Sequence, residues 1–250
     1  MMTIGDNRWT APSPNLRLTR SDVHIWYTSL EQPETRVCQC AQLLSEDERK
    51  QASRFHFERD RRRFIVSHGV LREILSRYLD VAPDQVQYRH GLRGKPYLAV
   101  SSDGYDLQFN MAHSNEVALY AIASGREVGI DLEYVQPIAD VEQISSRFFS
   151  LREDATLRSL PETQRLEAFF SCWTRKEAYL KAVGDGLTRP LNHFDVLLKP
   201  GEPTKLLHVE QAPQETDRWS LQTLVPAPGY VAALCVEGHD WQLACWRLGG

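Results

Sequence analysis

Two acidic segments, separated by about forty residues, most constrain what this chain can build. The first, V-G-I-D-L-E at residues 128–133, has the alternation that predicts a strand. Because successive strand side chains point to opposite faces, Asp131 and Glu133 share one face. The second, W-T-R-K-E-A-Y-L-K at residues 173–181, has helical spacing, which places Glu177 and Lys181 on one helix face. The sequence thus offers two carboxylates on a strand, and a third with an ammonium group on a helix.

The three carboxylates indicate a site for Mg²⁺. Mg²⁺ prefers oxygen ligands and completes its shell with water and phosphate oxygens, and no Cys or His stands in either segment. Neighbouring acids also repel each other unless a cation lies between them. Two other interpretations remain open: Asp131 and Glu133 as solvated acids at an exposed strand end, and Glu177 with Lys181 as a surface ion pair. The metal interpretation indicates phosphoryl or diphosphate transfer.

Two further motifs stand upstream, R-G-K-P at residues 93–96 and F-N-M-A-H-S at residues 109–114. Each motif is short, but the four together, in this order, resemble the Sfp-type 4′-phosphopantetheinyl transferases over residues 43–187. The resemblance implies a Mg²⁺-dependent enzyme that transfers the 4′-phosphopantetheine arm of coenzyme A to a serine of an apo acyl or peptidyl carrier protein. The other product would be 3′,5′-ADP. The carrier could serve fatty-acid, polyketide or nonribosomal-peptide synthesis.

The resemblance also implies roles for the acidic segments. Asp131, Glu133 and Glu177 would be the metal ligands, and Glu177 and Lys181 the catalytic pair. Lys181 would contact a phosphate oxygen. Glu177 is the first choice for the general base, and a metal-bound water relayed by Glu133 is the alternative.

The upstream motifs would bind coenzyme A. The resemblance implies that Lys95, and less directly Arg93, contact the adenosine end, and that His113 contacts a phosphate. Ala112 departs from the family pattern, which usually has serine there, so one hydroxyl contact would be missing or supplied by Ser114.

The 3′-phosphate of coenzyme A would lie against basic residues of the first helical region. In this chain Glu48 and Gln51 stand where lysines are common in the family. We therefore expect substitutes among Arg49, Lys50 and Arg63.

Two other function classes fit part of the sequence. A metal-dependent nuclease or phosphodiesterase would use the same carboxylates and lysine, and a non-catalytic module would only bind coenzyme A or a carrier protein. The net charge of −4 argues against a nucleic-acid partner. Neither alternative accounts for all four motifs.

Periodicity predicts a mixed α/β (α+β) chain. An extended arm covers residues 1–20, followed by two similar α/β subdomains at residues 21–125 and 126–250. The resemblance implies that a pseudo-twofold relates them and that the active site lies in the cleft between them. We expect a helix beginning at the Ser45 capping box, which runs on into the basic region, and further helical segments at residues 60–79, 140–160 and 163–183. Strands are expected at residues 23–27, 85–90, 107–111, 117–123, 128–133, 194–198, 219–224, 230–236 and 242–246.

Composition places the chain in a reducing compartment. Its five cysteines form no C-x-x-C pair, which favours free thiols. No stretch has the roughly 18 apolar residues that a membrane span needs, and the N-terminus lacks a signal-peptide pattern. We therefore expect a soluble, cytoplasmic monomer without a membrane partner.

Overall fold

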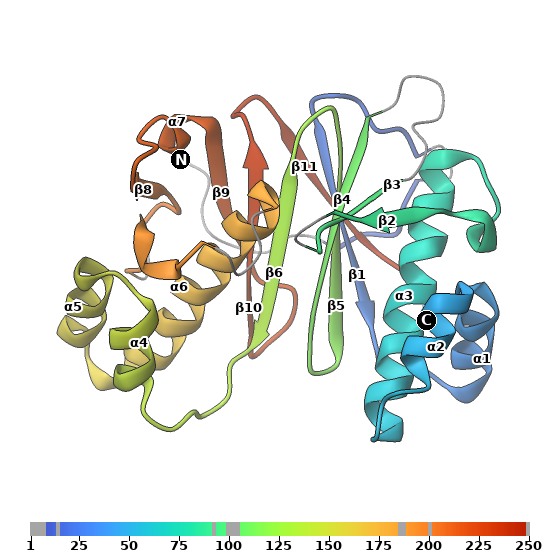
Figure 1. Ribbon diagram of the computed structural model, residues 1–250, viewed down its shortest axis with the longest axis horizontal. Coiled ribbons are helices and arrows are strands. Elements are labelled where there is room, and N and C mark those ends of the chain that lie inside the picture. The colour runs from blue at the N-terminus through green and yellow to red at the C-terminus, as the bar shows by residue number, and fades with distance from the viewer. Residues whose placement is uncertain are drawn as a thin grey trace.

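The computed structural model describes residues 9–13, 16–91, 94–98, 106–184, 189–199 and 202–248. Its elements form four layers, with helices outside and two sheets between them (Figure 1). The helices are α1 (Glu34–Leu43), α2 (Glu46–Ala52), α3 (Glu58–Leu79), α4 (Val141–Phe148), α5 (Leu151–Ser159), α6 (Glu162–Val183) and α7 (Glu215–Arg218). The mixed α+β class predicted from the sequence is confirmed.

The first sheet has the strand order β11-β1-β5-β4. It contains β1 (Asp22–Ser29), β4 (Leu107–Ser114), β5 (Val117–Ser124) and β11 (Gln242–Arg247). β11 is parallel to β1, and the other two pairs are antiparallel. The last strand of the chain therefore lies in the same sheet as the first.

The second sheet has the order β6-β10-β9, with both pairs antiparallel. Its strands are β6 (Val128–Tyr134), β9 (Trp219–Leu224) and β10 (Tyr230–Glu237). Two small hairpins complete the strands, β2 (Tyr88–His90) with β3 (Pro96–Leu98) and β7 (Phe194–Val196) with β8 (Leu206–Val209). The predicted boundary at residues 125/126 falls in the turn between β5 and β6, and stays a prediction.

Alternation along the strands separates three hydrophobic cores. In β1, Ile25 packs in the core between the sheets, whereas Trp26 packs in the core below α3. In β6, the apolar side chains Val128, Ile130 and Leu132 also enter the core between the sheets. The third core lies between α6 and the other face of the second sheet. Residues 129, 131 and 133 therefore face the side of β6 on which α6 lies.

The helix expected through the basic region is interrupted. The Ser45 capping box is present, but α2 ends at Ala52, and α3 begins only at Glu58. The intervening chain allows Phe55 to pack on Phe64 of α3, with ring centroids 5.3 Å apart. Burial of one aromatic face thus outweighs continuation of the helix.

The structure also shows the state of the cysteines and the character of the helices. All five cysteines are free thiols, four of them buried. Among the helices of the described residues, none combines the length and the apolar character needed to cross a membrane.

Candidate active site

Gly129 brings the first acidic segment close to the second. A Cβ atom at this position would lie 2.2 Å from the backbone oxygen of Ala178 and 2.3 Å from the nitrogen of Ala182, both in α6. Only glycine permits this approach. β6 and α6 therefore lie in direct backbone contact, and the acids of both segments come together.

Three carboxylates lie near one another where β6 faces α6. Asp131 is 6% exposed, and Glu133 and Glu177 are half-buried. Burial raises the pKa of Glu177, and the negative charges of Asp131 and Glu133 raise it further. Burial and the charge of Asp131 likewise raise the pKa of Glu133. The sequence prediction that these acids face one another is consistent with this arrangement, in which each destabilises the negative charge of the others.

Lys181 supplies the compensating charge. Its Nζ lies 2.6 Å from Oδ1 of Asp131. Burial raises the pKa of Asp131, and this ion pair only partly offsets the effect. Oδ2 of Asp131 is buried and has no hydrogen-bond partner among the described residues. A buried carboxylate oxygen without a partner is costly, so this atom marks a place for a cation or a donor.

The donor set fits a hard cation, although the side chains do not enclose one as they stand. Within the described part of the chain, no three His, Cys, Asp or Glu side chains group closely enough to hold a metal ion. The donors that face one another are nonetheless all carboxylate oxygens, which is the chemistry that Mg²⁺ prefers. Together with the unpartnered Oδ2 of Asp131, this chemistry fits Mg²⁺.

The site lies at a seam between the two sheets. β4 and β6 share no backbone ladder, but Asn110 Oδ1 accepts a hydrogen bond from the Ile130 nitrogen at 2.9 Å. Ser114 Oγ accepts one from the Tyr134 nitrogen and donates one to Glu133 Oε2, both at 3.0 Å. The F-N-M-A-H-S motif thus joins the sheets and orients a carboxylate. The Ser114 hydroxyl, considered from the sequence as a nucleotide contact, binds Glu133 here.

Further basic side chains lie near His113. Partial burial lowers the pKa of His113, and the nearby His68, Lys181 and Arg63 lower it further. The residue remains exposed at the end of β4. Arg63 also donates to Glu31 Oε1 at 3.0 Å. His113, Arg63 and Lys181 therefore lie in one neighbourhood.

Lys95 reaches the same region from the R-G-K-P motif. Its Nζ contacts Glu127 Oε2 at 2.6 Å and the backbone oxygen of Ala182 at 2.7 Å. Lys95 and Lys181 line one cavity of about 260 Å³, together with Asn110, at the C-terminal end of α6. Two upstream motifs and the helix motif therefore converge.

Two of the remaining candidates are not brought to this group. Arg49 and Lys50 lie exposed on α2, where Lys50 pairs with Glu46 at 2.7 Å. No contact among the described residues links either of them to His113. Arg93 lies outside the described residues. All three stay predictions.

Glu48 has a role that sequence reasoning missed. It is buried and accepts hydrogen bonds from Ser45, Arg72 and Tyr88, and its Oε1 lies 3.2 Å from His68 Nδ1. Burial would raise the pKa of Glu48, but these bonds and the charge of Arg72 hold it well below its usual range. The capping-box pattern was the only signal of this position in the sequence.

Comparisons with known proteins show to which family the chain belongs. A model of the 4′-phosphopantetheinyl transferase superfamily matches residues 127–235, and a model of the N-terminal region of such transferases matches residues 29–125. The 4′-phosphopantetheinyl transferase HetI of Nostoc sp. is 44% identical over 239 residues, which cover 96% of this chain and 98% of that protein. The chain belongs to the 4′-phosphopantetheinyl transferase family.

Other members of the family are more distant. A putative 4′-phosphopantetheinyl transferase of Synechocystis sp. is 35% identical, over 67% of both chains. The transferase Sfp of Bacillus subtilis is 27% identical, over 80% of this chain and 84% of Sfp. The family predicted from the four motifs is thus confirmed, and the chain is a 4′-phosphopantetheinyl transferase.

Proposed function

We propose that this transferase moves the 4′-phosphopantetheine arm of coenzyme A to a serine of an apo acyl or peptidyl carrier protein, with Mg²⁺ as cofactor. The observation that carries the proposal is the meeting of Asp131, Glu133 and Glu177 beside Lys181, with one buried Asp131 oxygen unpartnered. Such a site suits a substrate that brings phosphate oxygens and a cation together.

Asp131, Glu133 and Glu177 would hold the ion. When bound, Mg²⁺ supplies positive charge that stabilises the diphosphate and the charge developing on the leaving group. Ser114 orients Glu133 through the hydrogen bond at 3.0 Å. Lys181, His113, Arg63 and Lys95 bind the phosphates of coenzyme A.

The reaction is a displacement at phosphorus. The serine Oγ of the carrier forms a bond to the β-phosphorus of coenzyme A, while the bond from that phosphorus to the bridging oxygen breaks and 3′,5′-ADP leaves. Glu177 accepts the serine proton. It is half-buried, its pKa is raised by burial and by Asp131, and no described residue occupies its carboxylate by a hydrogen bond or ion pair, so it is suited to this role.

Intact-mass measurement tests the proposal. The protein is incubated with an apo carrier protein, coenzyme A and Mg²⁺, and the carrier should gain the mass of one phosphopantetheine. Controls omit coenzyme A, or replace Mg²⁺ with a chelator, and should show no gain. A phosphodiesterase or a non-catalytic binding module predicts no gain under any of these conditions.

A further inference from the structure

Lys176, next to Glu177 in α6, is completely buried and takes no part in the proposed reaction. Its Nζ lies 2.8 Å from Glu153 Oε2, and the two side chains are 0% and 2% exposed. The same Nζ donates to the backbone oxygens of Leu191, at 2.8 Å, and Phe194. Leu191 is the first residue of the 3₁₀ turn η3 (Leu191–His193), and Phe194 follows that turn. One ammonium group therefore fixes α6 to the chain that follows it.

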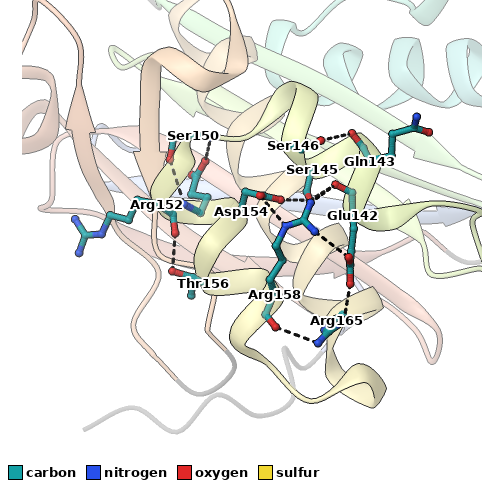
Figure 2. A network of polar contacts seen from close by, with 11 residues as sticks. Glu142, Gln143, Ser145, Ser146, Ser150, Arg152, Asp154, Thr156, Arg158 and Arg165 are labelled. Atoms are coloured by element: carbon teal, nitrogen blue, oxygen red, sulfur yellow. Dashed lines mark hydrogen bonds and ion pairs between the residues drawn. The ribbon is translucent and has the colours of Figure 1, made fainter.

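Glu153 extends this connection to α5. It forms a capping box with Ser150 at the start of that helix, and its Oε1 accepts a hydrogen bond from the Val196 nitrogen at 2.8 Å. On the outer surface, Figure 2 shows a second network, in which Arg165 of α6 contacts Glu142 of α4 at 2.6 Å. The helices around Lys176 are thus tied together on two sides.

The first half of the chain contains the same arrangement. Glu48 forms the capping box of α2 and pairs with Arg72 of α3 at 2.7 Å. Arg72 donates to the backbone oxygens of Pro83 at 3.4 Å and Val86 at 2.9 Å. Pro83 is the first residue of the 3₁₀ turn η1 (Pro83–Gln85), and Val86 follows that turn. A buried clamp of glutamate, cation and two carbonyls therefore occurs twice, once with arginine and once with lysine.

The two clamps differ in the residue that follows the cation. In α3 this residue is Glu73, which binds Arg36 through two hydrogen bonds of 2.7 and 2.6 Å. In α6 it is Glu177, which has no such partner among the described residues and faces Asp131 and Glu133. Repulsion among these carboxylates favours movement of α6 away from β6. Something must hold the helix against that repulsion.

We propose that Lys176, through Glu153 and the two carbonyls, is a positioning residue that keeps Glu177 opposite Asp131 and Glu133. The proposal rests on the proposed function for its catalytic consequence. Gly129 sets how closely β6 approaches α6, and Lys176 fixes the same turn of α6 to η3 and α5. The buried clamp thereby acts on the metal-binding carboxylates without touching substrate.

Lys176→Met tests the proposal, with Lys176→Arg as the conservative variant. Because supporting residues behind metal ligands commonly contribute 10- to 100-fold, we expect Lys176→Met to lower kcat and Mg²⁺ affinity by roughly tenfold or more. The KM for coenzyme A should change by less than about twofold. Lys176→Arg should restore most of both losses, since Arg72 performs the same task in the first half. Activity is measured per folded molecule, and Mg²⁺ binding by calorimetry without coenzyme A.

Arg72→Met is the matched control, because it removes the buried cation of the other clamp. It should lower stability but leave kcat at saturating coenzyme A and Mg²⁺ affinity unchanged. If Lys176→Met does not fold, Glu153→Gln, which keeps the size of the side chain, is measured in the same way. The proposal is overturned if the folded variant keeps kcat and Mg²⁺ affinity within about twofold of wild type, or if Arg72→Met loses as much. If the wild-type protein binds Mg²⁺ more tightly than the Lys176→Met variant but transfers nothing, only the proposed function is overturned.

Discussion

The two halves of the molecule share one strand arrangement but differ in what they bury at corresponding positions. The order β1-β5-β4 in the first sheet matches β6-β10-β9 in the second. Trp26 of β1 lies opposite Tyr120, the fourth residue of β5, and Asp131 of β6 lies opposite Ala233, the fourth residue of β10. The first half thus buries an indole ring where the second buries a carboxylate. We therefore expect the same backbone position to serve stability in one half and chemistry in the other.

The outer edges of the two strands also differ. β11 pairs with the outer edge of β1 from Asp22 to Tyr27. Among the described residues, no strand pairs with the corresponding edge of β6, and only Asn110 and Ser114 of β4 reach its backbone. An unpaired edge leaves room for side chains and ligands. We therefore expect the chemistry in the half whose strand carries the acids and, among the described residues, has an edge without a paired strand.

The largest expected effect is that of Asp131→Ala, compared with Trp26→Ala. Loss of a metal ligand removes several kcal/mol of transition-state stabilisation, so transfer should fall by roughly a thousandfold. Stability should not fall, because one repelling acid is gone. Trp26→Ala should instead cost about 3–5 kcal/mol of unfolding free energy, with kcat retained per folded molecule. Denaturant titrations and single-turnover transfer measure both. If Asp131→Ala transfers at close to the wild-type rate and its Mg²⁺ dependence is unchanged, Asp131 is not a metal ligand.

Glu177→Gln and Glu73→Gln compare the glutamates that follow the two buried cations. Glu177→Gln keeps the size of the side chain but removes a ligand and base, so transfer should fall by roughly a hundredfold. Glu73→Gln weakens the ion pair with Arg36 and should cost about 1 kcal/mol of stability, without a loss of kcat. Single-turnover transfer at saturating coenzyme A and Mg²⁺ distinguishes them. A Glu177→Gln rate within about threefold of wild type would contradict the assignment of the second motif.

His113→Ala tests the comparison between the ends of the corresponding strands β4 and β9. His113 lies at the end of β4, whereas the exposed Val225 follows the corresponding strand β9. If the imidazole binds a phosphate equally in the ground and transition states, His113→Ala should raise the KM for coenzyme A roughly tenfold, and lower kcat less. The ratio should grow below neutral pH, where the wild-type imidazole gains charge. Val225→Ala should change neither constant. An unchanged KM in His113→Ala would make this histidine a structural residue.

The smallest expected effect concerns His24, which corresponds in the strand pairing to Gly129. His24 is buried, its Nδ1 lies 2.8 Å from the Tyr78 hydroxyl, and burial lowers its pKa below the usual 6.5. The unfolded chain therefore takes up the proton first, and the free energy of unfolding should fall as pH decreases below about 6.5. His24→Gln should flatten this slope. Urea titrations over this pH range measure the free energy of unfolding of the wild type and of His24→Gln. If His24 does not contribute, this free energy will change with pH equally in the two proteins.

Local sequence patterns predicted many elements well. β9 was expected at residues 219–224 and occupies those residues, and the long helix expected at 163–183 is α6, Glu162–Val183. β9 alternates between buried and half-buried residues over most of its length, and α6 buries most residues from Ala168 to Ala182, so both segments are apparent from local patterns. By contrast, α1 was not predicted. It has no side-chain N-cap and buries only Val37 and Cys40.

Tertiary contacts explain why α1 forms. Cys40 packs directly over Gly69 of α3, where an added Cβ would lie 2.5 Å from the cysteine Cβ. Arg36 of the same helix holds Glu73. These partners lie 29 and 37 residues away in the sequence, so a local window contains no sign of them.

The sequence by itself determined which acids share a face. Asp131 and Glu133 follow from the two-residue period of a strand, and Glu177 and Lys181 from the spacing of a helix. These relations depend only on backbone geometry within one segment. The family, too, followed from the order of four short motifs.

The tertiary structure decided which side chain each group contacts. Lys181 pairs with Asp131, Ser114 binds Glu133, and Lys176 binds Glu153, across separations of 50, 19 and 23 residues. These contacts arise because packing of two sheets and their helices brings distant segments within a few ångströms. No local pattern records that packing, since it depends on the fit of all the buried side chains at once.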